Sequence, residues 1–226
     1  MQNCETCIIR SKAVNTLNPK ELRFLMESCA ETTYNPRESI IKEGMLSSHI
    51  AYLKSGLAMV SKKGVKGVDQ ILKIVQPGNY LGLQTILFEK VNQFSVTALD
   101  KCVVCFIDNL SFKELISRNN QFANELLLFL CREELTYFER FVNIHQKQIA
   151  GRIADIILFF SEKIYANALT FEMPLSRGDI AALVCTTRES VTRAIKDLSE
   201  IKTIRVTGRK FEILDLARLK KINQSG

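Results

Sequence analysis

The sequence contains no apolar run long enough to cross a membrane. Its apolar runs, such as residues 126–131 and 156–160, are far shorter than the roughly 18 residues that a membrane-spanning helix needs. Residues 1–12 have no apolar core of the kind found in secretory signals. We therefore expect a cytoplasmic protein with no membrane partner, whose seven cysteines are mostly reduced rather than paired in disulfides.

Residue sets that mark common enzymes are also missing. No Ser/His/Asp set, glycine-rich phosphate loop or catalytic zinc triad can be found, and two histidines, His49 and His145, give little support for haem. A thiol oxidoreductase using Cys4 and Cys7 would need a strand before that motif, within a βαβ unit, and no strand pattern precedes it. We expect the protein not to be an enzyme.

Composition and charge indicate a folded chain with one basic part. The 226 residues are 46% hydrophobic and 24% charged, which excludes intrinsic disorder and suits one large or two modest domains. Residues 1–146 carry 17 Lys and Arg against 15 Asp and Glu, whereas residues 147–226 carry 14 against 9. The concentration of positive charge in the last third favours a nucleic-acid partner for that part.

The first half of the chain combines one helix signal with many strand signals. Asn18, Pro19 and Glu21 form a helix start, with a cap residue, a proline at the first position and a glutamate at the third. Residues 32–108 then hold short apolar runs separated by glycine, proline and polar turns, with a hairpin tip at 62–67 and another turn at 77–79. This alternation predicts an antiparallel barrel or sandwich.

A long helix is predicted over residues 122–143, which contain no glycine or proline. Apolar residues recur along it at spacings of three and four, and others lie on its remaining faces. The recurring set is Phe122, Leu126, Phe129, Leu130, Tyr137 and Phe141. A helix that is apolar nearly all round must be packed on two sides. We assign these two contacts to the strand domain and to the same helix of a second subunit. The alternative is a helix buried within one subunit.

Two short helices with a tight turn between them are predicted near the C-terminus, after a further helix over about 148–165. Ser176 stands three residues before Asp179, and Thr186 stands three before Glu189, which predicts a capping box at the start of each helix. Residues 184–186 form the turn. This arrangement is typical of a helix-turn-helix.

The second of these helices has a polar face suited to reading DNA bases. Arg188 and Arg193 match guanine O6 and N7, and Glu189 can accept from cytosine N4. Residues 203–214 predict a hairpin with a basic tip, which is a wing placed for phosphate contact. The residues expected to read bases are Arg188, Glu189, Thr192 and Arg193, and those expected to contact phosphates are Ser176, Thr187, Lys196, Arg209 and Lys210.

At this point the whole chain resembles the superfamily of the cAMP receptor protein and the fumarate–nitrate reductase regulator, because residues 188–193 resemble its base-reading run and Gly151–Ala154 its hinge side. The resemblance implies an α+β fold: an N-terminal cyclic-nucleotide-binding-like β-barrel of the cupin or jelly-roll type (residues 1–118), a dimerisation helix (119–146) and a winged helix-turn-helix (147–226). It also implies a homodimer on a palindrome with TGTGA-like half-sites and RNA polymerase as a partner. Thr192 stands where oxygen-sensing relatives carry serine, which allows a mixed base preference.

The residues at the effector-binding positions differ from those of the cAMP-binding members of this superfamily. Those members use an Arg-Ser pair for the phosphate and a Gly-Glu-Leu run for the ribose, and here the matching positions read Phe94, Ser95 and Gly82-Leu83-Gln84. The positions that meet adenine fall at Tyr137 and Phe138. Because a buried phosphate without its arginine is costly, we expect no cAMP binding. An apolar ligand in the same pocket, or no ligand, stays open.

The cysteines form two CxxC motifs, Cys4 with Cys7 and Cys102 with Cys105, a pattern typical of metal sites. The resemblance implies an oxygen-labile [4Fe–4S] cluster, with Cys4, Cys7 and Cys105 at family ligand positions and Cys102 or Cys29 replacing a ligand that is alanine here. The alternatives are zinc, a thiol–disulfide switch and ordinary buried thiols. In a strand, an offset of three would place Cys102 and Cys105 on opposite faces.

Overall fold

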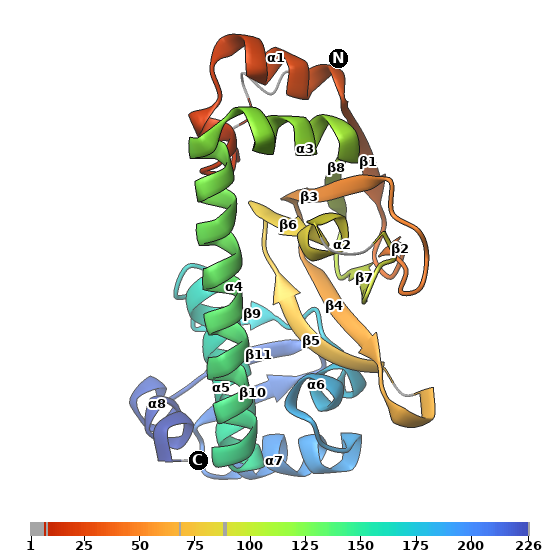
Figure 1. Cartoon of the computed structure of the whole chain (residues 1–226). Coiled ribbons are helices and arrows are strands. Elements are labelled where there is room, and N and C mark those ends of the chain that lie inside the picture. The colour runs from red at the N-terminus through yellow and green to blue at the C-terminus, as the bar shows by residue number, and fades with distance from the viewer. Residues whose placement is uncertain (1–6, 8, 68, 88–89, 226) are drawn as a thin grey trace. The chain divides into compact units, whose positions relative to one another are not determined.

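The computed structural model describes residues 7, 9–67, 69–87 and 90–225 (Figure 1). The chain divides into two compact units, Met1–Glu134 and Leu135–Gly226. None of the helices in the described part of the chain combines the length and the apolarity that crossing a bilayer requires.

The first unit begins with a short 3₁₀ turn, η2 (Val14–Thr16), and helix α1 (Pro19–Glu27). The predicted capping box is confirmed: the Asn18 side chain accepts from the backbone N–H groups of Lys20 and Glu21, and Glu21 accepts from the backbone of Asn18. The start of α1 is therefore fixed by local sequence alone.

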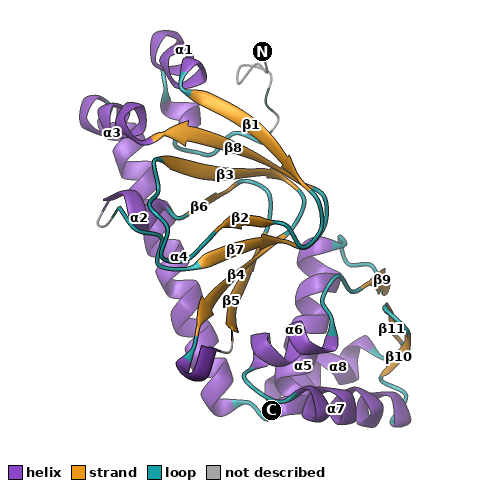
Figure 2. Ribbon diagram, turned by 90° about the vertical axis from the view of Figure 1, so that its right-hand side faces the viewer, coloured by secondary structure: helices purple, strands orange, loops and turns teal. Residues whose placement is uncertain are grey.

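Eight strands follow in two antiparallel sheets, ordered β1-β8-β3-β6 and β2-β7-β4-β5 (Figure 2). Their bounds are β1 Cys29–Tyr34, β2 Ser39–Ile41, β3 His49–Ser55, β4 Ala58–Lys63, β5 Asp69–Val75, β6 Asn79–Leu81, β7 Ser95–Ala98 and β8 Cys102–Asp108. The predicted hairpin is present as β4 and β5, with the turn η3 (Val65–Gly67) between them.

The prediction of a barrel needs correction, because the two sheets do not close on each other. Each sheet keeps two edge strands, so the domain is a jelly-roll-like sandwich. One core, which includes Leu53, Val60, Val96 and Val104, joins residues of both sheets. Alternation of apolar residues reports which side of a strand is buried, and it does not report whether the outer strands pair.

A second core lies on the other face of the first sheet. Tyr52 and Tyr80 of this sheet pack with residues of α1, of α2 (Leu83–Leu87), of α3 (Asn109–Arg118) and of the long helix α4 (Asn120–Gln146). The Asn119 side chain accepts from the backbone N–H of Phe122 at 2.9 Å and so fixes the start of α4. The predicted long helix is thus confirmed, with a few more residues at each end.

The second unit starts within α4 and contains the predicted helix-turn-helix. Helix α5 (Ile149–Phe159) ends in a π-helical turn, η4 (Phe160–Ile164), and the predicted helix over 148–165 is therefore two pieces. The remaining elements are β9 Thr170–Glu172, α6 Arg177–Val184, α7 Arg188–Glu200, β10 Ile204–Thr207, β11 Lys210–Ile213 and α8 Leu216–Ser225. The small sheet has the order β10-β11-β9.

Candidate nucleic-acid interface

Helix α6 is the first helix of the helix-turn-helix, and its capping box is confirmed. Ser176 Oγ accepts from the backbone N–H of Asp179 at 3.1 Å, and Asp179 Oδ2 accepts from that of Ser176 at 2.8 Å. The helix ends at Cys185, whose φ of 56° is left-handed, and the N–H of Thr186 closes back on the carbonyl of Ala181 at 3.0 Å. This tight reversal is the turn of the motif.

Helix α7 is the second helix, and its predicted cap was wrong by one residue. The N-cap is Thr187 rather than Thr186, because Thr187 Oγ1 accepts from the backbone N–H of Ser190 at 3.2 Å. Thr186 is still part of the reversal that closes α6, and the backbone becomes extended only at Thr187. Glu189 consequently stands at the second helical position, within the first turn.

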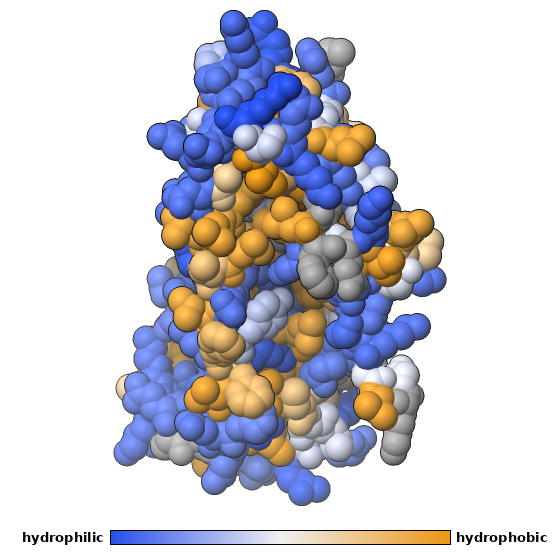
Figure 3. Space-filling view, viewed as in Figure 1, coloured by the Kyte–Doolittle hydropathy of each residue, from blue (hydrophilic) through white to orange (hydrophobic). Residues whose placement is uncertain are grey.

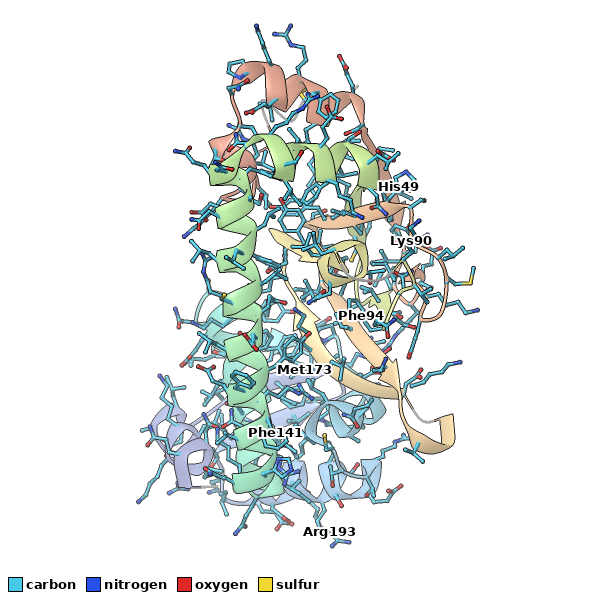
Figure 4. All side chains as sticks on the ribbon, viewed as in Figure 1. His49, Lys90, Phe94, Phe141, Met173 and Arg193 are labelled. Carbon is cyan, nitrogen blue, oxygen red and sulfur yellow. The ribbon has the colours of Figure 1, made fainter. Side chains whose placement is uncertain are left out.

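The two faces of α7 separate as predicted. The apolar residues Val191, Ala194, Ile195 and Leu198 are buried. The opposite face is solvent-exposed and includes every residue expected to read bases: Arg188, Glu189, Thr192 and Arg193. Lys196, which is expected to contact phosphate, is also exposed on this face. Figure 4 shows Arg193 projecting outward from the end of the unit. The side chains that can bind DNA are thus presented by a helix whose other face is fixed in a core.

The chemistry of this face matches base edges in a major groove. The pKa of the Glu189 carboxyl lies below its ordinary value, since it accepts hydrogen bonds from its own backbone N–H and from Thr187 and has Arg188 beside it. Glu189 is therefore an ionised acceptor. The Thr192 hydroxyl donates to the carbonyl of Arg188 at 2.9 Å, which fixes its rotamer.

The residues expected to contact phosphates occupy three places. Ser176 and Thr187 cap α6 and α7, so that their hydroxyl oxygens already accept backbone N–H groups. Arg209 and Lys210 are exposed at the tip of the β10–β11 wing, and the tip turns at Gly208, which has a φ of 62°. Lys196 lies on the exposed face of α7, where its Nζ is 3.4 Å from Oε1 of Glu200.

Sequence reasoning missed Arg177, the first residue of α6. Its guanidinium lies 5.1 Å from the centre of the Phe211 ring in β11, and it connects the helix-turn-helix to the wing. Its place directly after the cap residue Ser176 was a signal for a helix N-terminus, and nothing local indicated the partner ring.

The effector positions lie in both units. Leu83, which we predict to stand at the place of the acidic residue, is 1% exposed and belongs to the core around Tyr80. Gly82 before it has a left-handed φ of 80°. Ser95 Oγ accepts from the backbone N–H of Glu43 at 3.0 Å, and Phe94 packs against the core between the sheets. Gln84 is exposed. Tyr137 and Phe138 belong to the second unit.

The cysteines of the second CxxC motif do not converge on one site. Cys102 is buried between the two sheets, where its thiol donates to the carbonyl of Leu57 at 3.1 Å, and burial raises its pKa to about 11. Cys105 lies on the other face of β8, with its thiol 3.5 Å from Glu31 Oε1. The predicted metal set that includes both residues is therefore wrong for Cys102.

Cys7 and Cys105 both lie near Tyr52 of the first sheet: burial raises the pKa of the Tyr52 hydroxyl, and the two thiols raise it further. The Tyr52 hydroxyl donates to the carbonyl of Ile9 at 3.0 Å, and Tyr52 is the cross-strand neighbour of Cys105. Cys4 falls outside the described residues. Within the described part of the chain, no three His, Cys, Asp or Glu side chains lie close enough together to hold a metal ion.

Helix α4 presents an apolar surface that its own subunit leaves uncovered (Figure 3). Phe122 and Leu126, two of the predicted seam residues, are buried in the core of the first unit, and they cannot face a partner. Exposed positions instead recur at alternating spacings of three and four, which we call the α4 stripe: Leu128, Cys131, Leu135, Phe138, Val142 and His145. Leu135 is 59% and Phe138 58% exposed, and exposed apolar side chains grouped along one surface mark sites of interaction.

Comparison with known proteins gives consistent matches to both units. A family profile described as "Cyclic nucleotide-binding domain" matches residues 31–119, and one described as "Crp-like helix-turn-helix domain" matches residues 125–222. These two profiles together span most of the chain.

Curated proteins match over nearly the same length. The nitrogen fixation regulation protein FixK of Bradyrhizobium diazoefficiens is 24% identical over 223 residues, which cover 97% of this chain and 93% of FixK. The cAMP-activated global transcriptional regulator CRP of Escherichia coli O157:H7 is 25% identical over 194 residues, covering 83% of this chain and 91% of CRP.

Solved structures share the fold. FixK2 from Bradyrhizobium japonicum superimposes with a TM-score of 0.77 at 21% identity and covers 86% of this chain and 97% of its own. A putative regulator of the crp/fnr family from Eubacterium rectale gives a TM-score of 0.80 at 16% identity, with 95% and 98% covered.

Proposed function

Because the chain belongs to the CRP/FNR family of transcription regulators, we propose that it binds a palindromic DNA site as a homodimer and responds to a signal at its N-terminal domain. The chain is a DNA-binding regulator and not an enzyme, as its relatives are regulators. The observation that carries the proposal is the exposed face of α7, where Arg188, Glu189 and Arg193 project from a helix anchored by a buried apolar face.

Base reading follows from the first turns of α7. Arg188 and Arg193 would each donate two hydrogen bonds to a guanine, and Glu189 would accept from a cytosine N4 on the paired strand. These pairings support half-sites close to TGTGA. Thr192 keeps its hydroxyl on the helix backbone, so that its methyl group is the part offered to DNA. Arg209 and Lys210 of the wing, with Lys196 and the caps Ser176 and Thr187, would contact phosphates.

The α4 stripe supports the homodimer. Its alternating spacing of three and four is the pattern with which two parallel helices pack around a two-fold axis. A two-fold dimer places two recognition helices about one helical turn apart on DNA. We propose that the dimer acts in the cytoplasm and that RNA polymerase is its partner at promoters.

Binding to an operator duplex tests this function. The duplex carries two inverted TGTGA half-sites whose centres lie about one helical turn apart, and a scrambled duplex is the control. We expect specific binding whose affinity falls by roughly 10³–10⁵ between 50 and 200 mM salt, the range for a protein that contacts six to ten phosphates. Equal affinity for both duplexes at all salt concentrations would contradict sequence-specific recognition.

We propose that the signal shifts a population of dimers between two packings of α4. Packing of α4 against its partner sets the spacing of the two recognition helices and thereby the affinity for the operator. The signal differs from cAMP, since Leu83 replaces the acidic ribose ligand with a buried apolar side chain and Phe94 replaces the phosphate ligand. An apolar small molecule bound near these residues is the ligand class that they support.

cAMP is accordingly expected to leave operator binding unchanged. A phosphate placed beside Phe94 would have no arginine partner, and an unpaired buried charge is strongly unfavourable. The measurement is operator affinity by fluorescence anisotropy with and without millimolar cAMP, together with calorimetric titration of the protein with cAMP. An increase of tenfold or more in operator affinity would show that the nucleotide is the signal after all.

A second candidate function is redox sensing through cysteine. The observation that favours it is that the thiols of Cys7 and Cys105 both lie near Tyr52, on the side of the first sheet that faces the helices. A [4Fe–4S] cluster would draw its ligands from this side, with Cys4 and a further thiol such as Cys29, the first residue of β1. Cys102 does not fit such a set because it faces the core between the sheets.

The two cysteines of β8 give a matched test of this candidate. If a cluster forms, protein purified without oxygen should contain iron and acid-labile sulfide and absorb near 400 nm. Cys105→Ser should lose the iron, whereas Cys102→Ser should keep it. Absence of iron and sulfide from the anaerobic wild-type protein, or equal loss in both variants, would count against the cluster.

A further inference from the structure

The C-terminal end of α6 is held by two arginines that come from other helices. A helix leaves its last four carbonyl groups without partners within the helix. In α6 the Ala181 carbonyl accepts a hydrogen bond from the backbone N–H of Thr186, which lies in the turn itself. The carbonyls of Leu183 and Val184, which directly precede the turn, accept from arginine side chains instead.

The first of these arginines is Arg140, which belongs to α4. One of its guanidinium nitrogens, Nη2, lies 2.5 Å from the carbonyl oxygen of Leu183, and the guanidinium also hydrogen-bonds the Cys185 side chain at the turn. A cation at this position is favoured twice, since it satisfies a carbonyl and meets the negative end of the helix dipole.

The second arginine, Arg152 of α5, makes a parallel connection. Its Nη1 donates to the carbonyl of Val184 at 3.0 Å, and its Nε donates to that of Lys147, just after α4, at 2.8 Å. Both arginines therefore connect α4, or the residue just after it, to the turn that follows α6.

This turn directly precedes α7, the proposed recognition helix, and so determines the position at which α7 begins. Arg188, the first residue of α7 and a proposed base reader, follows the Arg140-bound carbonyl of Leu183 by five residues. On α4, Arg140 stands between Phe138 and Val142 of the α4 stripe. One helix thus carries the proposed dimer surface and, on another face, the side chain that holds the turn.

We propose that Arg140 is a positioning residue that ties the helix-turn-helix to the dimer helix, so that the packing of α4 against its partner determines where the recognition helix sits. This inference rests on the proposed function. The hydrogen bond passes any rotation or shift of α4 to the end of α6, and from there to α7. Without it, the domain keeps its buried core and loses one of its direct connections to α4.

Three variants of the full-length protein test the role of Arg140. Arg140→Ala removes the donor, and Arg140→Lys keeps a cation that can still reach the Leu183 carbonyl. Arg132→Ala is the control, because Arg132 is 54% exposed on the same helix and its ion-pair distance to Glu125 is 3.9 Å. Operator affinity is measured for each on a series of duplexes in which the spacing of the half-sites changes by one base pair at a time.

We expect Arg140→Ala to lose at least tenfold in affinity for the operator duplex and also to discriminate less between spacings. It should remain a dimer by sedimentation and keep wild-type affinity for scrambled DNA at low salt. Arg140→Lys should recover part of the loss, and Arg132→Ala should match wild type. Loss of spacing preference is the decisive readout, because unfolding of the domain would lower all affinities together.

Two outcomes would overturn the inference. In one, Arg140→Ala binds the operator and discriminates spacings as wild type does. In the other, it loses operator and scrambled DNA equally along with thermal stability, which would make Arg140 a purely structural residue. Failure of the wild-type protein to prefer the operator would instead contradict the proposed function, so the two failures can be told apart.

Discussion

Replacing Phe138 with glutamate is expected to convert the dimer into a monomer and to abolish specific operator binding. Phe138 lies in the middle of the α4 stripe and is 58% exposed in one subunit. In the dimer, the two Phe138→Glu side chains would face each other in a desolvated seam, and like charges so placed cost several kcal/mol. Sedimentation velocity measures the first effect and operator anisotropy the second.

Leu110→Glu provides the matched control for this variant. Leu110 lies on α3, outside the α4 stripe, and is 78% exposed, so the same kind of charge enters at a surface that we assign to no partner. This variant should stay dimeric and bind the operator normally. A Phe138→Glu protein that remains a dimer at micromolar concentration would show that the subunits associate through another surface.

Replacing Arg193 with alanine is expected to weaken operator binding by about 1–3 kcal/mol at each half-site, which is roughly 5-fold to 150-fold in affinity per half-site. The reason is the loss of a bidentate contact to guanine, made by an exposed side chain on the reading face of α7. Binding to scrambled DNA should change little, since the phosphate contacts remain. Anisotropy titrations on both duplexes at one salt concentration give the comparison.

Arg209→Ala, at the tip of the wing, separates base reading from general attraction to DNA. It removes the same charge from a residue that we assign to phosphate contact, so operator and scrambled DNA should weaken alike. The salt slope should fall by about two, one for the Arg209 of each subunit. If Arg193→Ala behaved in this way as well, Arg193 would be a phosphate contact and the assignment of base-reading residues would need revision.

Local sequence was sufficient to predict the helix-turn-helix and the wing. The Ser176–Asp179 box, the buried set from Val191 to Leu198 and the basic tip at Arg209 each depend on residues within one or two turns of each other. Such local signals predict the folded structure correctly because the hydrogen bonds and contacts that they imply form within one element. The one local error, the cap at Thr186, arose because two threonines compete and the left-handed Cys185 decides between them.

Features that depend on long-range packing could not be predicted. Periodicity placed Phe122 and Leu126 on an apolar face of α4, but it could not distinguish the face that meets the sheet from the face that meets a partner. The contacts of Arg140 with Leu183 and of Arg177 with Phe211 join residues more than thirty positions apart. No pattern within either segment indicates its partner.

The N-terminal domain retains a family fold, and we propose that its effector differs from that of the cAMP-binding members. The cyclic nucleotide-binding profile covers residues 31–119, which include Leu83 and Phe94, the residues that we propose to stand in place of the family's polar ligands. A fold is specified by its buried apolar pattern, whereas a ligand depends on a few side chains that can change within the pattern. Membership of the family therefore supports DNA binding more strongly than it supports any particular signal.

The central claim, a two-fold dimer reading DNA with α7, is tested most directly by changing the distance between half-sites. Affinity should be highest when the two TGTGA half-sites lie about one helical turn apart, and should fall sharply when about five base pairs are inserted, because half a turn rotates one half-site to the far side of the duplex. Inserting about ten should leave the affinity low, because the second half-site then faces the protein again but lies one further helical turn along the duplex than the second recognition helix. An affinity independent of spacing, or a single half-site bound as tightly as the palindrome, would contradict the dimer.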